Sequence, residues 1–127
     1  MTSVFADSPS VAEELEADWD AISIDYVDTD AKYGAYVTGG SWSVWTSFDQ
    51  LSRAGAAGRV ALIEEGARLL GVEPGKCVAE NSQVVCGNQQ ISYGEIVAKG
   101  QLSRTYTDEQ LASLPLKPAK DRKLVGV

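Results

Sequence analysis

Residues 43–70, SVWTSFDQLSRAGAAGRVALIEEGARLL, carry the longest helical pattern in the chain and decide its fold. Apolar residues recur every three or four positions along two adjacent stripes, which make a face wider than a surface helix usually shows. One stripe is Val44, Phe48, Leu51, Gly55, Leu62 and Leu69, and the other is Ala56, Val60, Ile63, Ala67 and Leu70. This width predicts a central helix that needs covering on more than one side. We do not expect a chain of 127 residues to supply all of that covering, so an apolar patch is predicted to stay exposed along Val44–Leu70.

Three glycines, Gly55, Gly58 and Gly66, interrupt this pattern. A glycine in a helix interior costs about 1 kcal/mol relative to alanine. We expect that cost where another backbone must approach the helix closely, so the glycines predict tight packing against neighbouring elements. The alternative is a bend or a break of the helix near Gly55–Gly58.

Two elements are predicted before the central helix. The sequence Pro9-Ser10-Val11-Ala12-Glu13 has the spacing of a capping box, which predicts a helix that starts at Ser10 and runs to about Asp18. Apolar and polar residues alternate over Ile22–Asp28, which is typical of a half-buried strand. A loop over residues 29–40 then leads to the central helix.

A β-hairpin is predicted after the central helix, with strands Cys77–Glu80 and Gln83–Cys86 and a turn at Asn81–Ser82. A third short strand is predicted at Gln89–Ile91. In this register Cys77 lies directly opposite Cys86, which is close to the geometry of a disulfide bond. Two interpretations stay open: a bridge formed in an oxidising compartment, or two free thiols in a reduced protein.

Further capping boxes at Ser92–Glu95 and Thr107–Gln110 predict two short helices near the C-terminal end. Residues 115–127 follow as an extended basic exit, which we interpret as a solvated connector. Together these elements predict one α+β domain over residues 1–127. In it, one long central helix packs with a small antiparallel sheet or hairpin and two or three short helices.

Composition narrows the classes of function. The 127 residues include no histidine, and 18 acidic residues outnumber 11 basic ones, which gives a net charge of −7. Without histidine the chain lacks the commonest general base and metal ligand, and two cysteines alone cannot build a zinc site. An acidic chain without a basic stripe argues against nucleic acid as a partner. The acidic excess lies in the first 50 residues and is interpreted as a solvated face.

The stretch most suggestive of chemistry is Thr38-Gly39-Gly40-Ser41-Trp42-Ser43, at the head of the central helix. Two glycines let a ligand approach the backbone, and free N–H groups at a helix N-terminus suit an anion such as phosphate. The stretch matches neither a Walker loop nor a dinucleotide fingerprint. From the residues alone, a ligand site and a simple turn with a serine cap are both open.

A series of motifs in a fixed order resembles one family. They are Val11–Leu15, Asp18–Trp19, the strand ending near Asp28, Thr38–Ser43, Ala54–Ala57, Ile91–Glu95 and Leu116–Gly126. They resemble the large subunit of isoquinoline 1-oxidoreductase and the related membrane-associated aldehyde dehydrogenases, within the xanthine dehydrogenase superfamily. The resemblance implies a fragment of such a subunit, in which only Thr2 could match the Gly-Gln-Gly-Thr cofactor motif that normally comes first. The alternative is a stand-alone binding or assembly module that keeps this fold without cofactor.

In that family the large subunit binds molybdenum through molybdopterin cytosine dinucleotide, and a small subunit carries [2Fe–2S] clusters. The resemblance implies that this cofactor contacts Gly39, Gly40, Ser41 and Ser43, and also Thr38, in the complete subunit, with none bound by this chain alone. It implies as partners the remainder of the large subunit and the [2Fe–2S] subunit. A homodimer through the exposed central helix is a further expectation. The parent complex is expected in the periplasm or at a membrane, with the cytoplasm as the alternative.

The resemblance also implies the reaction, which oxidises an aldehyde or an N-heterocycle with oxygen derived from water. The family's catalytic base is a glutamate in the far C-terminal part of the subunit, and no glutamate of this chain matches it. We interpret Glu13 and Glu95 as helix caps, and Glu14, Glu64 and Glu65 as surface charges. No catalytic residue is therefore expected in this chain.

Overall fold

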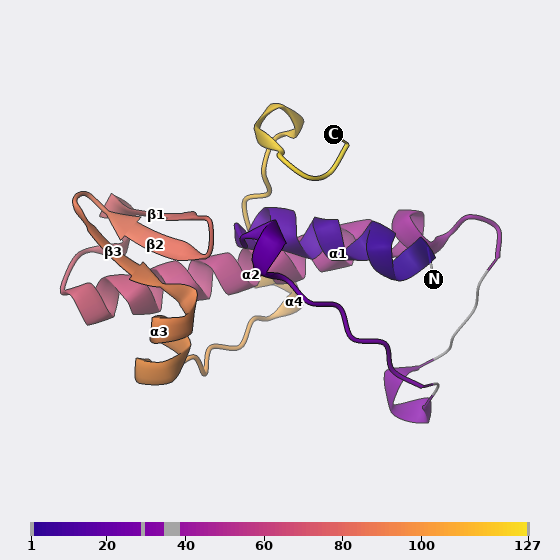
Figure 1. Cartoon of the computed structure of the whole chain (residues 1–127), viewed down its shortest axis with the longest axis horizontal. Helices are drawn as coiled ribbons and strands as arrows, with labels where there is room; N and C mark the ends of the chain where they lie inside the picture. The colour runs from indigo at the N-terminus through magenta and orange to yellow at the C-terminus, as the bar shows by residue number, and fades with distance from the viewer. Residues whose placement is uncertain (1, 29, 35–38, 127) are drawn as a thin grey trace.

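The computed structural model describes residues 2–28, 30–34 and 39–126. The fold is α+β, as predicted, and is built on the long central helix α2. The helices and strands are α1 (Thr2–Leu15), α2 (Ser43–Leu70), β1 (Cys77–Glu80), β2 (Gln83–Cys86), β3 (Gln89–Ser92), α3 (Tyr93–Lys99) and α4 (Asp108–Ser113). Helix α1 lies along the N-terminal half of α2, while the sheet and α3 lie at its C-terminal half (Figure 1).

Helix α2 runs without a break through its glycines, so the alternative of an interruption at Gly55–Gly58 is wrong. A Cβ at Gly55 would lie 2.5 Å from the carbonyl oxygen of Val11 in α1. At the other end of the helix, a Cβ at Gly66 would lie 3.1 Å from Cβ of Val84 in β2. The prediction of close packing at the glycines is therefore confirmed on both covered sides of α2.

The boundaries of α1 differ from the prediction. The helix extends from Thr2 to Leu15 with Pro9 inside it, so the proposed capping box at Ser10 is wrong. Ser10 is instead buried at 2% exposure. The physical reason is tertiary: the small side of α1 fits against the glycine-bearing face of α2, and this contact outweighs the local start signals. Ala12, at 2% exposure, is part of that buried side.

The strand predicted at Ile22–Asp28 is not formed. After a short 3₁₀ turn at Trp19–Ala21 the chain continues without regular structure through residue 28. Figure 1 shows this segment leaving the two helices and looping away from them. A strand needs a hydrogen-bonded neighbour, and the described sheet lies at the far end of α2. The described part of the predicted loop at 29–40 holds one further 3₁₀ turn, Ala31–Tyr33.

The sheet is an antiparallel meander in the order β1-β2-β3, and its first hairpin has the predicted register. Asn81 and Ser82 have φ values of 48° and 59°, as a tight two-residue hairpin turn requires. Cys77 lies opposite Cys86 and the two form a disulfide bond. The structure therefore agrees with the interpretation of a bridge and not with that of two free thiols.

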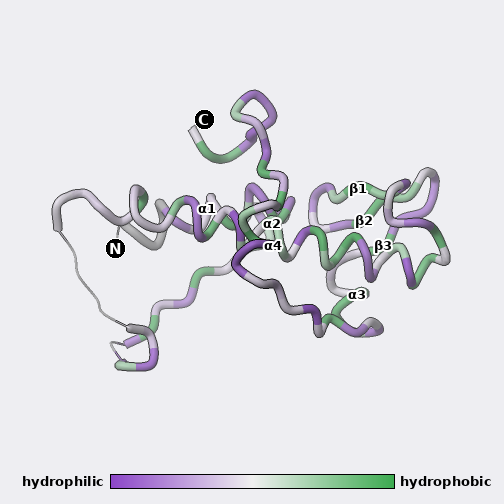
Figure 2. Tube along the Cα trace, turned by 180° about the vertical axis from the view of Figure 1, so that it is seen from behind, coloured by the Kyte–Doolittle hydropathy of each residue, from purple (hydrophilic) through white to green (hydrophobic). Residues whose placement is uncertain are grey.

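The core lies between the sheet, α3 and the C-terminal half of α2. Its buried members are Leu62, Ala67, Cys77, Val84, Cys86, Ile91 and Ile96. Figure 2 shows the hydrophobic stretches of the strands gathered at this end of the molecule. The capping box predicted at Thr107 is confirmed, because Thr107 accepts the N–H of Gln110 and the Gln110 side chain accepts the N–H of Thr107. At Ser92 half of the predicted box is formed: the hydroxyl accepts the N–H of Glu95, and the Glu95 carboxylate accepts from that hydroxyl instead of from the Ser92 N–H.

Candidate functional site

The glycine–serine corner, residues 39–43, forms the head of α2. Gly40 and Ser41 both have left-handed backbone conformations, with φ of 62° and 56°, and turn the chain into the helix. Trp42 is the N-cap residue and makes no side-chain capping bond. Four of the predicted cofactor contacts, Gly39, Gly40, Ser41 and Ser43, are thus brought together by one turn. The fifth, Thr38, lies outside the described residues.

The corner is an open backbone surface. Gly39, Gly40 and Ser41 are exposed, and a Cβ at Gly39 would meet no atom within 4 Å. The indole of Trp42 covers Gly40. The first N–H groups of a helix have no intrahelical acceptor, and no acidic side chain occupies the first turn of α2. Such N–H groups, at the positive end of the helix dipole, can bind an anionic group.

Large apolar side chains surround the corner. Trp42 is 57% exposed, Trp45 is 82% exposed and Val44 is 40% exposed. The apolar patch predicted along Val44–Leu70 is therefore present only at the head of α2. Further along, α1 and the sheet cover the helix, so that Leu62 and Ala67 are buried.

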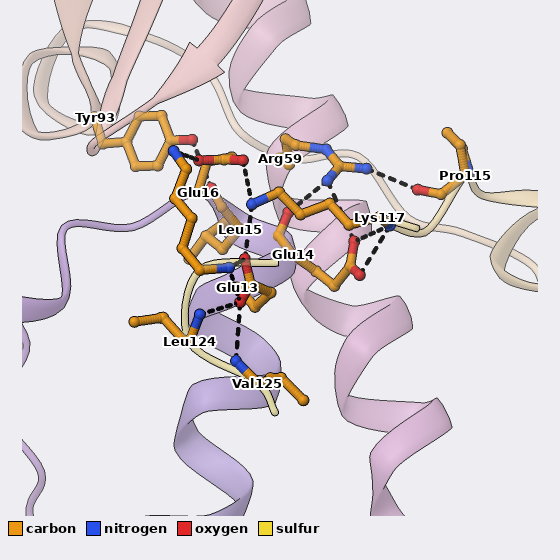
Figure 3. A network of polar contacts seen from close by, with 11 residues as sticks. Glu13, Glu14, Leu15, Glu16, Arg59, Tyr93, Pro115, Lys117, Leu124 and Val125 are labelled. Atoms are coloured by element: carbon orange, nitrogen blue, oxygen red, sulfur yellow. Dashed lines mark hydrogen bonds and ion pairs between the residues drawn. The ribbon is translucent and has the colours of Figure 1, made fainter. Parts of the chain in front are cut away.

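A second polar arrangement, which we call the carboxylate cluster, consists of Glu13, Glu14 and Glu16 at the end of α1 (Figure 3). The interpretation of Glu13 as a helix cap and Glu14 as a surface charge is wrong, since they are only 3% and 2% exposed. The Glu13 carboxylate accepts three consecutive backbone N–H groups, from Lys123 at 2.9 Å, Leu124 at 2.5 Å and Val125 at 3.0 Å.

Cationic side chains complete the cluster. The Lys117 ammonium donates to Glu13 at 2.8 Å and also pairs with Glu16. Glu14 accepts the backbone N–H of Lys117 at 3.0 Å and pairs with Arg59 of α2 at 3.3 Å. Arg59 in turn donates to the carbonyl of Pro115 at 2.7 Å. The cluster therefore joins α1, α2 and the C-terminal segment.

These contacts correct the interpretation of residues 115–127 as a solvated connector. The Lys117 side chain is only 12% exposed, and both Lys117 and residues 123–125 donate hydrogen bonds to Glu13 of α1 (Figure 3). Burial alone would raise the pKa of Glu13, but hydrogen bonds from Lys117 and from the three backbone N–H groups lower it to about 2. Burial lowers the pKa of Lys117, yet its hydrogen bonds to Glu13 and Glu16 give a net increase.

The remaining glutamates also have structural partners. Glu65, interpreted as a surface charge, is 9% exposed, and the hydrogen bond from Arg68, followed by that from the Gln101 N–H, lowers its pKa to about 2. Glu64 lies at the surface in an ion pair with Arg104. Within the described residues no group of three or more histidine, cysteine, aspartate or glutamate side chains could hold a metal ion. No helix of the described chain is long and apolar enough to cross a bilayer.

No family model matches the chain. Over 116 residues, which is 91% of the chain, it is 57% identical to a protein of Gluconacetobacter polyoxogenes named membrane-bound aldehyde dehydrogenase [pyrroloquinoline-quinone]. The chain is a relative of the membrane-bound aldehyde dehydrogenases. It spans only 15% of the length of that aldehyde dehydrogenase. The resemblance seen in the sequence motifs is thereby confirmed.

The chain is also similar, more weakly, to a second oxidoreductase. The chain is 28% identical over 120 residues, or 87% of its length, to isoquinoline 1-oxidoreductase subunit beta of Brevundimonas diminuta. Again the match spans 15% of the relative. Both relatives are oxidoreductases by name, and the aldehyde dehydrogenase is much the more similar. The chain thus corresponds to one segment of much longer oxidoreductase polypeptides.

Proposed function

We propose that this chain is a partial cofactor-binding domain of a larger aldehyde-oxidising enzyme and that it has no activity alone. The observation that carries the proposal is the 57% identity to one segment of a membrane-bound aldehyde dehydrogenase. The buried glutamates also support the proposal. Glu13, Glu14 and Glu65 accept hydrogen bonds from backbone N–H groups and pair with cationic side chains, so their carboxylates are not free to act as a general base. In this proposal residues 1–127 act as one domain, whose C-terminal segment is held on α1 by the contacts of Lys117 and of residues 123–125.

The cofactor contact is assigned to the glycine–serine corner, with Gly39, Gly40, Ser41 and Ser43 of the described chain and with Thr38. We propose molybdopterin cytosine dinucleotide carrying molybdenum, which is the cofactor that the family resemblance implies. The open backbone at Gly39 and the N–H groups at the head of α2 fit one anionic edge of such a group. The described residues supply no ligand set for a metal, so the metal would be held by the cofactor. When bound, the cofactor supplies the redox centre.

The name of the more similar relative specifies pyrroloquinoline quinone instead. This quinone is also anionic, so the chemistry of the corner suits either cofactor. As partners we propose the remainder of a large subunit and a [2Fe–2S] subunit, which the family resemblance implies. "Subunit beta" in one name supports an assembly of several subunits, and "membrane-bound" in the other supports association with a membrane.

The test requires the segment within a complete aldehyde dehydrogenase-type polypeptide, purified with its partner subunits. Molybdenum is counted by mass spectrometry, and pyrroloquinoline quinone is extracted and measured by fluorescence. We expect about one molybdenum per polypeptide. A preparation that is active with quinone and free of molybdenum would exclude the molybdopterin assignment.

A matched pair of variants tests the corner itself. Gly39→Val adds a side chain where the structure has no neighbour within 4 Å, so the fold should survive while the cofactor is displaced. Gly75→Val is the control, because Gly75 is equally open and also lacks a positive φ. We expect Gly39→Val to lower cofactor content at least tenfold and Gly75→Val to leave it unchanged. Equal cofactor content in the two variants would show that the corner does not contact the cofactor.

The second candidate is a stand-alone binding or assembly module that keeps this fold without cofactor. The observation in its favour is the carboxylate cluster, which closes the C-terminal segment onto α1 through buried ion pairs. A module of this kind would be a monomer with a single cooperative unfolding transition and no apolar dye binding. The cofactor-domain proposal instead predicts dye binding at Trp42 and Trp45, which is lost in the complete enzyme.

A further inference from the structure

The segment Ile22–Asp28 has the side-chain pattern of a strand and lacks a strand's partner. The N–H of Ile22 donates to the carbonyl of Trp19 at 3.3 Å. Beyond this bond, no backbone–backbone hydrogen bond joins residues 23–28 to another described residue. As far as the described residues go, the backbone groups of six consecutive positions are thus unpaired, as on the open edge of a sheet.

The side chains of this segment form an apolar surface. Tyr26 and Val27 are 58% and 57% exposed. Ile22, Ile24 and Tyr26, at alternating positions, line a hollow of about 330 Å³ together with Trp19. A larger hollow of about 490 Å³ separates the segment from α1. Apolar alternation beside an open backbone is the combination that β-strand addition uses, with hydrogen bonds for affinity and side-chain pockets for specificity.

Charge decides what kind of strand fits. The segment carries Asp25 and Asp28 and no basic residue, and Asp18 and Asp20 precede it directly. A symmetric antiparallel pairing of the whole segment with a second copy is centred on Asp25 and places Asp25 opposite Asp25. Like charges directly opposite each other are destabilising. The net charge of −7 adds to the repulsion between copies. A partner strand with basic residues at alternate positions meets neither penalty.

We propose that Ile22–Asp28 pairs with a strand of alternating apolar and basic residues that belongs to the remainder of the longer enzyme. The partner strand is assigned to the same enzyme because the match covers only 15% of the aldehyde dehydrogenase, so that 85% of its length lies outside the matched segment. The inference rests on the proposal that the chain is part of a longer enzyme, and it is independent of which cofactor that enzyme binds. It also gives a reason why a segment with the side-chain pattern of a strand has no pairing partner among the described residues.

The experiment uses overlapping peptides that cover the rest of the Gluconacetobacter polyoxogenes aldehyde dehydrogenase, probed with this chain. Peptides that bind are measured in solution by calorimetry, and the protected amides are mapped by hydrogen exchange. We expect the binding peptides to alternate apolar and basic residues and to protect the amides of residues 22–28. A scrambled peptide of the same composition should not bind.

Two charge reversals give a matched comparison. Asp25→Lys should weaken the binding of such a peptide at least about threefold, because an attractive cross-strand pair becomes a repulsive one. Glu80→Lys makes the same change at an exposed position of the edge strand β1, and its affinity should equal that of the wild type. Equal weakening by both variants would show a general charge effect and overturn the assignment to this segment.

Three other outcomes would also overturn the inference. One is a peptide set in which nothing binds, and another is binding that protects the amides of β1 in place of residues 22–28. The third is a concentration-dependent dimer in which residues 22–28 are protected, since the occupant would then be a second copy. None of these outcomes changes the cofactor content of the Gly39→Val enzyme, so the two proposals fail separately.

Discussion

The carboxylate of Glu13 accepts the backbone N–H of Lys123 at 2.9 Å, although the two residues are 110 positions apart in the sequence. The same oxygen accepts the next two N–H groups of the chain, and Lys117 supplies the compensating charge. A buried carboxylate is tolerable only with partners of this kind. Glu13 therefore holds residues 123–125 of the C-terminal segment on the first helix, while Glu14 holds the backbone of Lys117.

Replacing Glu13 by glutamine should destabilise the fold strongly. A neutral amide accepts the three N–H groups less well and leaves the buried Lys117 ammonium without part of its counter-charge. Removal of one member of a buried ion pair costs about 3–5 kcal/mol. The free energy of unfolding from urea titration measures the loss. Glu64→Gln is the control, since the exposed pair with Arg104 should contribute less than about 1 kcal/mol. Similar losses in both variants would contradict the role given to Glu13.

The same carboxylate predicts how stability depends on pH. The pKa of Glu13 is about 2 in the folded chain and 4.5 in its ordinary state, so the unfolded chain takes up a proton first as the pH falls. The stabilisation is complete above about pH 5 and is lost as the pH falls from 4.5 towards 2, with a total of about 3 kcal/mol. Urea midpoints measured between pH 6 and pH 2 should therefore fall less steeply in Glu13→Gln than in the wild type. Parallel curves would show that Glu13 is not the group responsible.

The disulfide between Cys77 and Cys86 closes a short loop around the first hairpin. By restricting the unfolded chain, a loop of this size contributes about 2–3 kcal/mol. Dithiothreitol should lower the unfolding free energy of the wild type by this amount and leave a double variant, Cys77→Ser with Cys86→Ser, unaffected. The bond itself is checked by mass spectrometry: protein that has not been exposed to reductant is denatured and alkylated, and the alkylated cysteines are counted. Two alkylated cysteines would show that the bond does not form.

The sequence predicted those parts of the fold that local patterns determine. Helix α2, the register that places Cys77 opposite Cys86, and the caps at Ser92 and Thr107 depend on residues close together in the chain. The start of α1 could not be predicted in this way, because its contact with α2 outweighs the signal at Ser10. The burial of a glutamate such as Glu13 depends on partners more than 100 residues away.

Of the two polar sites, one could be predicted from local sequence and the other could not. The glycine–serine corner was recognised because Gly39, Gly40 and Ser41 are consecutive and precede a strong helical pattern. The carboxylate cluster was missed, although one signal was present: three glutamates within residues 13–16 and a basic cluster near the C-terminal end. A search for complementary charge between distant segments would have paired them. The alternation of apolar and polar residues in Ile22–Asp28 predicts a strand, but it cannot indicate whether a neighbouring strand is present to pair with it.

The contact between Gly55 and α1 gives the sharpest test of the helix packing. A glycine-to-alanine change in a helix interior normally stabilises it by up to about 1 kcal/mol. At Gly55 the new Cβ would lie 2.5 Å from the carbonyl oxygen of Val11, a backbone atom that can move only with α1. Overpacking of this kind costs about 1–3 kcal/mol, so Gly55→Ala should be destabilising.

Gly58→Ala is the matched control for this change on the same helix. Its new Cβ would lie 2.9 Å from Cδ1 of Leu15, the end of a side chain that can rotate away. We therefore expect Gly58→Ala to be neutral or mildly stabilising, and Gly55→Ala to lower the unfolding free energy by at least about 1 kcal/mol. Urea denaturation of the two variants measures the difference. If Gly55→Ala were the more stable variant, α1 would not lie against α2 at Val11, and the burial of Glu13 and Glu14 would lose its structural basis.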